Sequence, residues 1–324
     1  MPSIDRNPLI HGSNLSQKEA HRTKYRDQDS RRYLSEIRGK YDEWHNANML
    51  LSGPSTEIRV GDRESTNQRV ELLTEYKDFL DQQHYAEKFD SRSNLHSSVL
   101  EEFLYYLFKD VVAAFGKHAL IGKSHTFKDI FFVPPRYSDM LKRPYGRIER
   151  KDHDFVIGAT VQASLESSTP PERDLNAGKE VALIKEEPEV YTEVTVAGNT
   201  ETHLFDIPAV AIECKTYLDK TMLEGSSRAA EDLKARNPNC LYLVVMEWIK
   251  LTSDVNLRKY KVDQIYVLRK QKNTDREFRY GEGYSKNPID TEVVWHLFNL
   301  VRNHLIRDWT GGIELGIERG WLIE

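Results

Sequence analysis

A strand-length apolar run that ends in an acid and a base is the feature that most limits how this chain can fold. Residues 208–216 read Pro-Ala-Val-Ala-Ile-Glu-Cys-Lys-Thr. Alternate side chains of a strand share a face, so Glu213 and Lys215 are predicted to point the same way while Cys214 points into the protein. A carboxylate at the end of a buried strand can hold a hard cation, and an ammonium beside it can orient a water molecule on that cation. This pairing suits the hydrolysis of a phosphodiester.

The acid–base spacing alone is a weak signal, because it recurs elsewhere in the chain. Residues 75–77, 149–151 and 232–234 repeat it in helical or highly charged stretches, where two such side chains diverge or face water. Only the copy at residues 213–215 follows a strand-like apolar run. The neighbouring segments therefore decide its meaning.

The segments on either side of this run predict a core of strands and a helix. Residues 152–161 read as a strand with acids at its start. Residues 219–236 are compatible with a helix, and residues 240–246 form an apolar run typical of a buried strand. The predicted order is therefore a strand, the strand with Glu213 and Lys215, a helix and another strand.

With these residues in this order, the chain resembles the PD-(D/E)XK nuclease superfamily, whose core has the same succession of elements. The segment from Glu213 through Met222 to Leu233 is similar to type II restriction endonucleases of the BbvCI kind, which cut asymmetric DNA sites. The resemblance covers about residues 95–250. It implies an α/β (α+β) fold with a mixed sheet flanked by helices, and Mg²⁺-dependent cleavage of a specific double-stranded DNA sequence.

The resemblance also implies the roles of particular residues. Asp154 and Glu213 are the expected metal ligands, helped by the carbonyl of Cys214, and Lys215 is expected to position the attacking water. Asp152 lies two residues earlier on the same predicted face, so it is the alternative ligand. No proline precedes the aspartate, and the separation of Asp154 from Glu213 is longer than is usual in the superfamily, which requires an insertion.

A helix is predicted at residues 99–115, after Ser97 or Ser98 as its N-cap. Many nucleases of this superfamily carry a supporting glutamate on the helix before the core strands. Glu101 falls on the margin of the apolar stripe and Glu102 on the opposite side, so Glu101 is the candidate for this role. The alternative explanation is that acids favour the first turn of any helix.

Basic residues are concentrated just before the strand that carries Asp154. Three of them are predicted to contact the DNA backbone: Arg143, Arg147 and Lys151. A solvated surface is the alternative. The net charge of −5 argues against a broadly basic DNA coat protein, but it does not exclude a DNA enzyme.

The chain is predicted to have two regions. Residues 1–90 form an N-terminal helical region, which begins with an unstructured lead-in over residues 1–14 and either braces the core or clamps DNA. Residues 91–324 form the nuclease domain, with a β-hairpin insertion at about residues 164–205 that either enters a DNA groove or extends the sheet. Within that insertion, residues 189–196 alternate as a strand.

Composition and charge narrow the remaining possibilities. No apolar run approaches the roughly 20 residues of a membrane span, and the first residues lack the apolar core of a secretory signal. A cytoplasmic protein with two reduced cysteines, Cys214 and Cys240, is expected.

One set of metal ligands implies a homodimer or a heterodimer with a paralogous subunit, because two DNA strands must be cut. The alternatives are a DNA repair or recombination nuclease of the same fold, or a non-catalytic α/β interaction module.

Overall fold

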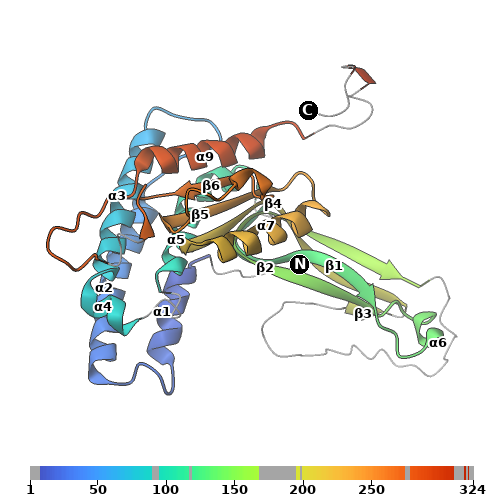
Figure 1. The fold of residues 1–324 in the computed structure, drawn as a ribbon. Coiled ribbons are helices and arrows are strands. Elements are labelled where there is room, and N and C mark those ends of the chain that lie inside the picture. The colour runs from blue at the N-terminus through green and yellow to red at the C-terminus, as the bar shows by residue number, and fades with distance from the viewer. Residues whose placement is uncertain are drawn as a thin grey trace.

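The structure of the chain is a computed structural model, which describes residues 8–89, 95–116, 119–167, 195–197, 199–273, 278–309, 317–318 and 320 (Figure 1). Its helices are α1 (Ile10–Ala20), α2 (Gln28–Leu50), α3 (Asp62–Leu80), α4 (Gln83–Lys88), α5 (Ser97–Ala113), α6 (Tyr137–Met140), α7 (Lys220–Lys234) and α9 (Thr291–Ile306), with a 3-10 turn at Leu257–Lys259. Its strands are β1 (Ala119–Phe132), β2 (Gly146–Glu166), β3 (Thr195–Ala197), β4 (Thr200–Leu218), β5 (Leu241–Ile249) and β6 (Gln264–Val267).

The six strands form one mixed sheet in the order β1–β2–β4–β5–β6, and β3 pairs with the outer end of β4. β1, β2 and β4 are antiparallel neighbours, whereas β4, β5 and β6 run parallel. Parallel strands need a crossover connection, and α7 supplies it between β4 and β5. The predicted succession is therefore present as β2, β4, α7 and β5.

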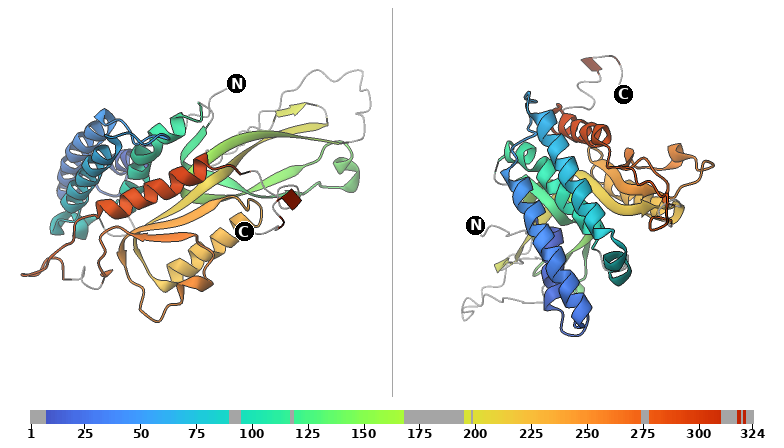
Figure 2. Two further views of the ribbon diagram at one scale, coloured as in Figure 1. Left: turned by 90° about the horizontal axis from the view of Figure 1, so that it is seen from above. Right: turned by 90° about the vertical axis from the view of Figure 1, so that its left-hand side faces the viewer.

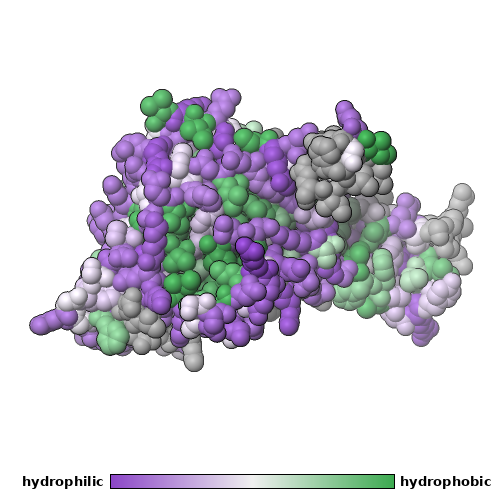
Figure 3. Space-filling model, turned by 45° about the horizontal axis from the view of Figure 1, so that its top comes forward, coloured by the Kyte–Doolittle hydropathy of each residue, from purple (hydrophilic) through white to green (hydrophobic). Residues whose placement is uncertain are grey.

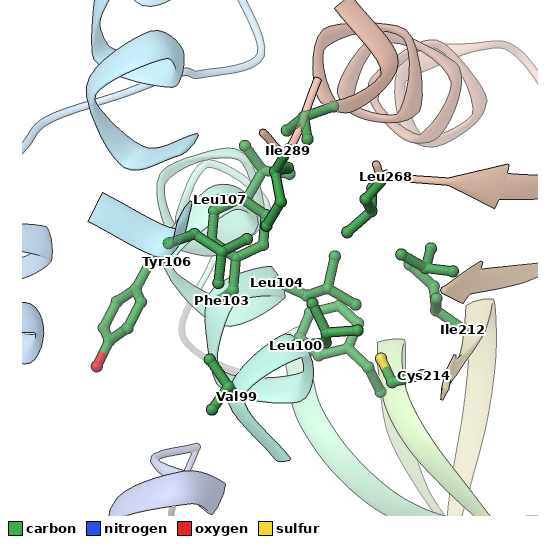
Figure 4. Packing of buried hydrophobic residues seen from close by; sticks show 14 of the residues in the cluster. Val99, Leu100, Phe103, Leu104, Tyr106, Leu107, Ile212, Cys214, Leu268 and Ile289 are labelled. Carbon is green, nitrogen blue, oxygen red and sulfur yellow. The ribbon is translucent and has the colours of Figure 1, made fainter. Parts of the chain in front are cut away.

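Helices cover both faces of the central strands. Ile212 of β4 belongs to the large core formed with α5 and α9, whereas its neighbour Ala211 packs with residues of α7 in a smaller cluster. Figure 4 shows Leu100 and Leu104 of α5 pointing toward Ile212 and Cys214 of the sheet. Burial on both faces explains why β4 reads as a continuous apolar run. The predicted mixed sheet flanked by helices is confirmed.

The long strands β1, β2 and β4 extend beyond the helical layer as an arm, with α6 at its tip (Figure 1; Figure 2). β2 folds back within this arm, because a side chain at its first residue, Gly146, would meet Leu165 near its last. The first part of β2 pairs with β1 and the last part with β4. The two layers touch where Phe127 of β1 packs edge-on against Phe205 of β4, with the ring centroids 5.0 Å apart. β2 therefore runs from the tip into the core and back again.

The bend in β2 coincides with two irregularities of strand pairing. Asp154 and Phe155 of β2 lie opposite the single residue Lys123 of β1, which is the pattern of a β-bulge. Four residues beyond Asp154, a Cβ on Gly158 would fall 2.1 Å from the carbonyl oxygen of Ile207, so only glycine fits there. Bulges bend a strand and re-aim its side chains. The bend thus places Asp154 at the inner end of the arm, next to the core.

The insertion predicted at about residues 164–205 begins within β2 and ends within β4. The last pair of this ladder joins Glu166 to Thr200, and β3 adds antiparallel to the start of β4. The strand predicted at residues 189–196 lies, apart from its last two residues, outside the described part of the chain. In the described part, both ends of the insertion extend the sheet.

Helix α1 is anchored by a buried carboxylate. Glu102 of α5 accepts hydrogen bonds from the backbone N–H groups of His11 and Gly12, at 2.9 and 3.1 Å. The hydroxyls of Tyr41 and Tyr106 also donate to it, at 2.9 and 2.5 Å. The unpaired N–H groups at the start of a helix favour such an acceptor, since the helix dipole is positive there.

The N-terminal helical region begins earlier in the chain than the sequence predicted. The lead-in expected over residues 1–14 is wrong from Ile10 onward, because α1 begins there. The partner that anchors α1 is remote in sequence, so no local pattern announces it. Helices from both predicted regions share one hydrophobic core with the sheet. The division at residue 90 stays a prediction.

Polar side chains cover most of the face seen in Figure 3, with apolar patches between them. Among the described helices, none combines the length and the apolar character that a membrane crossing requires.

A buried ion-pair network fastens α3 to the sheet. Glu247 of β5 pairs with Lys77 of α3 at 2.8 Å and with Arg269 at 2.7 Å, and all three side chains are almost fully buried. Burial alone would raise the pKa of Glu247, but the charges of Lys77 and Arg269 outweigh it and lower the pKa. A buried carboxylate needs such partners to stay charged.

Replacing Lys77 by methionine is expected to lower the free energy of unfolding by about 3–5 kcal/mol, because one oxygen of Glu247 stays buried without its counter-charge. The control is Lys40→Met, since Lys40 pairs with Glu43 at 2.9 Å on an exposed face of α2 and exposed pairs contribute little. Urea unfolding followed by tryptophan fluorescence measures both variants. Equal midpoints would contradict the importance given to the network.

Candidate active site

Pairing of β2 with β4 brings the predicted acidic residues together. Phe155 lies opposite Ile212 in the antiparallel ladder, so the preceding residue Asp154 falls beside Glu213 and Cys214. Oδ2 of Asp154 accepts a hydrogen bond from the backbone N–H of Cys214 at 2.9 Å. This bond fixes one carboxylate on the backbone of the neighbouring strand.

Lys215 lies between the two carboxylates. Its Nζ is 3.2 Å from Asp154 Oδ2 and 2.7 Å from Glu213 Oε2. Burial alone would lower the pKa of Lys215, but the charges of Asp154 and Glu213 outweigh it and raise the pKa. Burial alone would raise the pKa of Glu213, but the charge and hydrogen bond of Lys215 outweigh it and lower the pKa. Glu213 and Lys215 therefore hold each other in their charged forms.

Glu101 of α5 borders this cluster. The residue is 8% exposed, and burial raises the pKa of its carboxyl group to about 8, with the charge of Asp154 adding to the shift. The next residue, Glu102, points away into the contact with α1. Of the two adjacent glutamates, Glu101 is thus the one near the carboxylates, and its supporting role stays a prediction.

Asp152, the alternative ligand, lies apart from the cluster. The bulge interrupts the strand alternation, and Asp152 contacts the ring Nδ1 of His125 at an exposed position. His153 is buried, and its ring centroid lies 5.7 Å from that of Tyr242. Neither ring nitrogen of His153 has a hydrogen-bond partner among the described residues. Of the two aspartates, Asp154 is the one beside Glu213.

Only the backbone of Cys214 faces the site. Its thiol lies in the core, where burial raises its pKa. Cys214 and Cys240 are both buried and free. Use of the Cys214 carbonyl as a metal ligand stays a prediction.

The three predicted backbone-binding residues lie along the first part of β2 and the loop before it. Arg147 and Lys151 are exposed on the strand. Arg143 is less available, because its Nε lies 3.2 Å from the buried Glu201 and its guanidinium stacks 4.1 Å from the ring centroid of Tyr145. Since the strand rises about 3.3 Å per residue, these residues run from the bend toward the tip of the arm.

Two further side chains at the site were missed by sequence reasoning. The hydroxyl of Tyr242 on β5 donates a hydrogen bond to Glu213 Oε1 at 2.8 Å. Burial, and to a smaller extent the charge of Glu213, raises the pKa of Tyr242, so the phenol stays protonated. Lys123 is exposed on β1 opposite the bulge, and its charge acts on Glu101. The signal for Tyr242 is strand register: it pairs with the residue two positions before Glu213, on the same face.

The donor set suits a hard divalent cation. Asp154 and Glu213 each direct one oxygen at the single positive charge of Lys215, so both carboxylates reach one centre. Mg²⁺ takes one or two protein carboxylates and completes its octahedron with water and substrate oxygens. Among the described residues, no group of three or more His, Cys, Asp or Glu side chains gathers closely enough to hold a metal ion. The residues present therefore fit Mg²⁺.

The chain is similar to known proteins both in its sequence and in its fold. The model of the Bpu10I restriction endonuclease family matches residues 92–187 and 172–322. A solved structure described as the native BbvCI A2B2 tetramer at low resolution has a similar fold, with a TM-score of 0.61 and 21% sequence identity, covering 94% of this chain and 98% of that chain. No curated protein matches the chain.

The family match spans more than half of the chain, from α5 through α9. It includes every element that carries the site: α5, β1, β2, β4 and β5. The resemblance predicted from the sequence is confirmed. The chain belongs to the Bpu10I restriction endonuclease family and is a type II restriction endonuclease.

Proposed function

We propose that this enzyme cuts double-stranded DNA at a specific sequence by Mg²⁺-dependent hydrolysis at Asp154, Glu213 and Lys215. The observation that carries the proposal is the convergence of the two carboxylates on Lys215, within 3.2 and 2.7 Å of its Nζ. Because DNA is the substrate, the proposal places the enzyme in the cytoplasm.

The reaction joins the oxygen of a water molecule to phosphorus and breaks one phosphorus–oxygen bond of the backbone. Mg²⁺, when bound by Asp154 and Glu213, would lower the pKa of a water molecule and offset the charge that builds on the phosphate. Lys215 holds the attacking water by a hydrogen bond from its ammonium. Glu101 adds a carboxyl group beside Asp154, where burial and the charge of Asp154 raise its pKa and the charges of Lys123 and Lys215 act in the opposite direction.

Exposed cations around the site suit the DNA backbone. Lys151 lies three residues before Asp154 on β2, and Arg147 continues the same strand toward the tip of the arm. Lys123 lies across the bulge on β1. Contacts from such residues to phosphates hold a duplex in place without reading its sequence.

Two DNA strands of opposite polarity require two catalytic centres, and this chain has one set of Asp154, Glu213 and Lys215. The active enzyme therefore contains a second subunit, either identical or paralogous. The similar BbvCI structure is described as an A2B2 tetramer, which supports a paralogous partner. The chain would then cut one strand of the duplex.

Asparagine at position 154 is expected to lower the rate of Mg²⁺-dependent cleavage by roughly 100-fold or more, because a metal ligand loses its charge. The matched change Asp152→Asn is expected to leave the rate close to wild type, since Asp152 contacts His125 away from the cluster. Single-turnover cleavage of plasmid DNA in Mg²⁺ measures both, and EDTA should abolish it. A dead Asp152 variant beside an active Asp154 variant would reverse the assignment.

With a paralogous partner, Glu213→Ala or Lys215→Ala should turn the enzyme into one that nicks a single strand. With an identical partner, either change should abolish cleavage. Glu75→Ala is the control, because Glu75 and Lys77 repeat the same spacing on helix α3 and Glu75 is exposed there. Nicked and linear plasmid are counted on gels for each folded variant. Wild-type amounts of linear product from Glu213→Ala would refute the catalytic role.

Glutamine at Arg147 or Lys151 is expected to weaken DNA binding similarly across sequences and to reduce the salt slope by about 1 for each phosphate that the protein no longer neutralises. Arg143→Gln should change the slope less, because that guanidinium already pairs with Glu201. Binding is measured in Ca²⁺ over a range of salt concentrations. Unchanged slopes for Arg147 and Lys151 would mean that they are only solvated surface.

A further inference from the structure

The hydroxyl of Tyr242 is directed at Glu213 and is shielded from solvent. Its Oη donates to Glu213 Oε1 at 2.8 Å, while the Nζ of Lys215 holds the other oxygen, Oε2, at 2.7 Å. Each oxygen of the carboxylate therefore has a donor of its own. One donor is neutral and comes from β5, and the other is charged and comes from β4 itself.

The ring of Tyr242 has no room to turn away from this contact. The side chain is fully buried, and it packs in the small cluster beneath α7 with Ala211, Ala230 and Leu233. Its backbone N–H donates to Asp263 Oδ2 at 2.6 Å, which fixes the strand at this residue. Because the strand fixes the backbone of Tyr242 and the cluster packs around its ring, the hydroxyl points in one direction only.

A carboxylate that binds a metal ion is oriented by the hydrogen bonds its own oxygens accept. Glu213 has three rotatable side-chain bonds before its carboxylate, so the strand alone leaves its oxygens free to rotate. Lys215 cannot fix them unaided, because its ammonium also contacts Asp154 at 3.2 Å. The hydroxyl of Tyr242 carries no charge, so it can orient Glu213 without repelling a bound metal ion.

We propose that Tyr242 is a positioning residue for the metal-binding carboxylate: its hydroxyl turns Glu213 so that Oε2 faces Asp154 Oδ2. The inference rests on the proposed function of Glu213. It assigns Tyr242 a role in the affinity for the divalent ion and no contact with DNA or with the reacting atoms.

Tyr266 of the adjacent strand β6 supplies a matched control. It is also buried, and its hydroxyl lies 2.9 Å from the ring Nδ1 of His296. It belongs to the large core on the opposite face of the sheet from α7. Tyr266→Phe removes the same atom from another buried ring without touching the cluster.

The test compares Tyr242→Phe with Tyr266→Phe in the full-length protein. Mn²⁺ binding without DNA is followed by the loss of the free-ion electron paramagnetic resonance signal. Cleavage of plasmid is titrated with Mg²⁺, and DNA binding is measured without divalent ions. Tyr242→Phe is expected to weaken Mn²⁺ binding and to raise the half-saturating Mg²⁺ concentration, each about 10-fold. DNA affinity and the thermal midpoint should match those of Tyr266→Phe, and excess Mg²⁺ should restore cleavage.

Wild-type Mn²⁺ binding and Mg²⁺ dependence in a folded Tyr242→Phe protein would overturn the inference. A lowered thermal midpoint with cleavage abolished at every Mg²⁺ concentration would also overturn it, because it would show a purely structural role. Glu213→Ala separates this failure from that of the proposed function. If Glu213→Ala binds Mn²⁺ as well as wild type, the metal-binding role of Glu213 fails. If Glu213→Ala loses Mn²⁺ binding while Tyr242→Phe binds Mn²⁺ as wild type does, the positioning role alone fails.

Discussion

The bulge at Asp154 and Phe155 determines where the acidic groups of this enzyme meet. β2 pairs with β1 along its first part and with β4 along its last, and the bulge lies just before the residues where the two ladders overlap. A residue in a bulge is released from regular pairing, so its side chain can be re-aimed. Asp154 uses that freedom to accept the N–H of Cys214 at 2.9 Å. Arg147 and Lys151 precede Asp154 on the same strand, so the basic residues of the arm lead directly to the carboxylates.

Helix α5 couples the N-terminal helices to this site through two neighbouring glutamates. Glu102 is buried and accepts four hydrogen bonds, including two from the start of α1. Glu101, the residue before it, borders Asp154. A shift of α1 would therefore move the part of α5 that carries Glu102 and with it Glu101. These contacts support a brace rather than a clamp as the role of the N-terminal helices.

The sequence indicated the core well wherever burial on both faces leaves an unbroken apolar run, as in β4 and β5. It did not indicate β1, because residues facing inward there include Ser124 and Thr126, which are buried through hydrogen bonds to Asp206 and to a backbone carbonyl. The aspartate and the acid–base pair were found from their place at the ends of apolar runs, although the strands themselves extend beyond these residues, over Gly146–Glu166 and Thr200–Leu218. Tyr242 was not, because its role depends on the register between two strands and not on its own neighbours in sequence.

In this site, one group balances the negative charge of the carboxylates and other groups fix their orientation. Two carboxylates that point at one centre repel each other unless a cation lies between them, and Lys215 supplies that charge in the protein alone. The groups that fix the carboxylates are neutral: the N–H of Cys214 on Asp154 and the hydroxyl of Tyr242 on Glu213. Neutral donors keep the same geometry whichever cation balances the charge. In the mechanism that we propose, the carboxylates stay in place while Lys215 turns to a water molecule, which is the preorganisation that electrostatic catalysis requires.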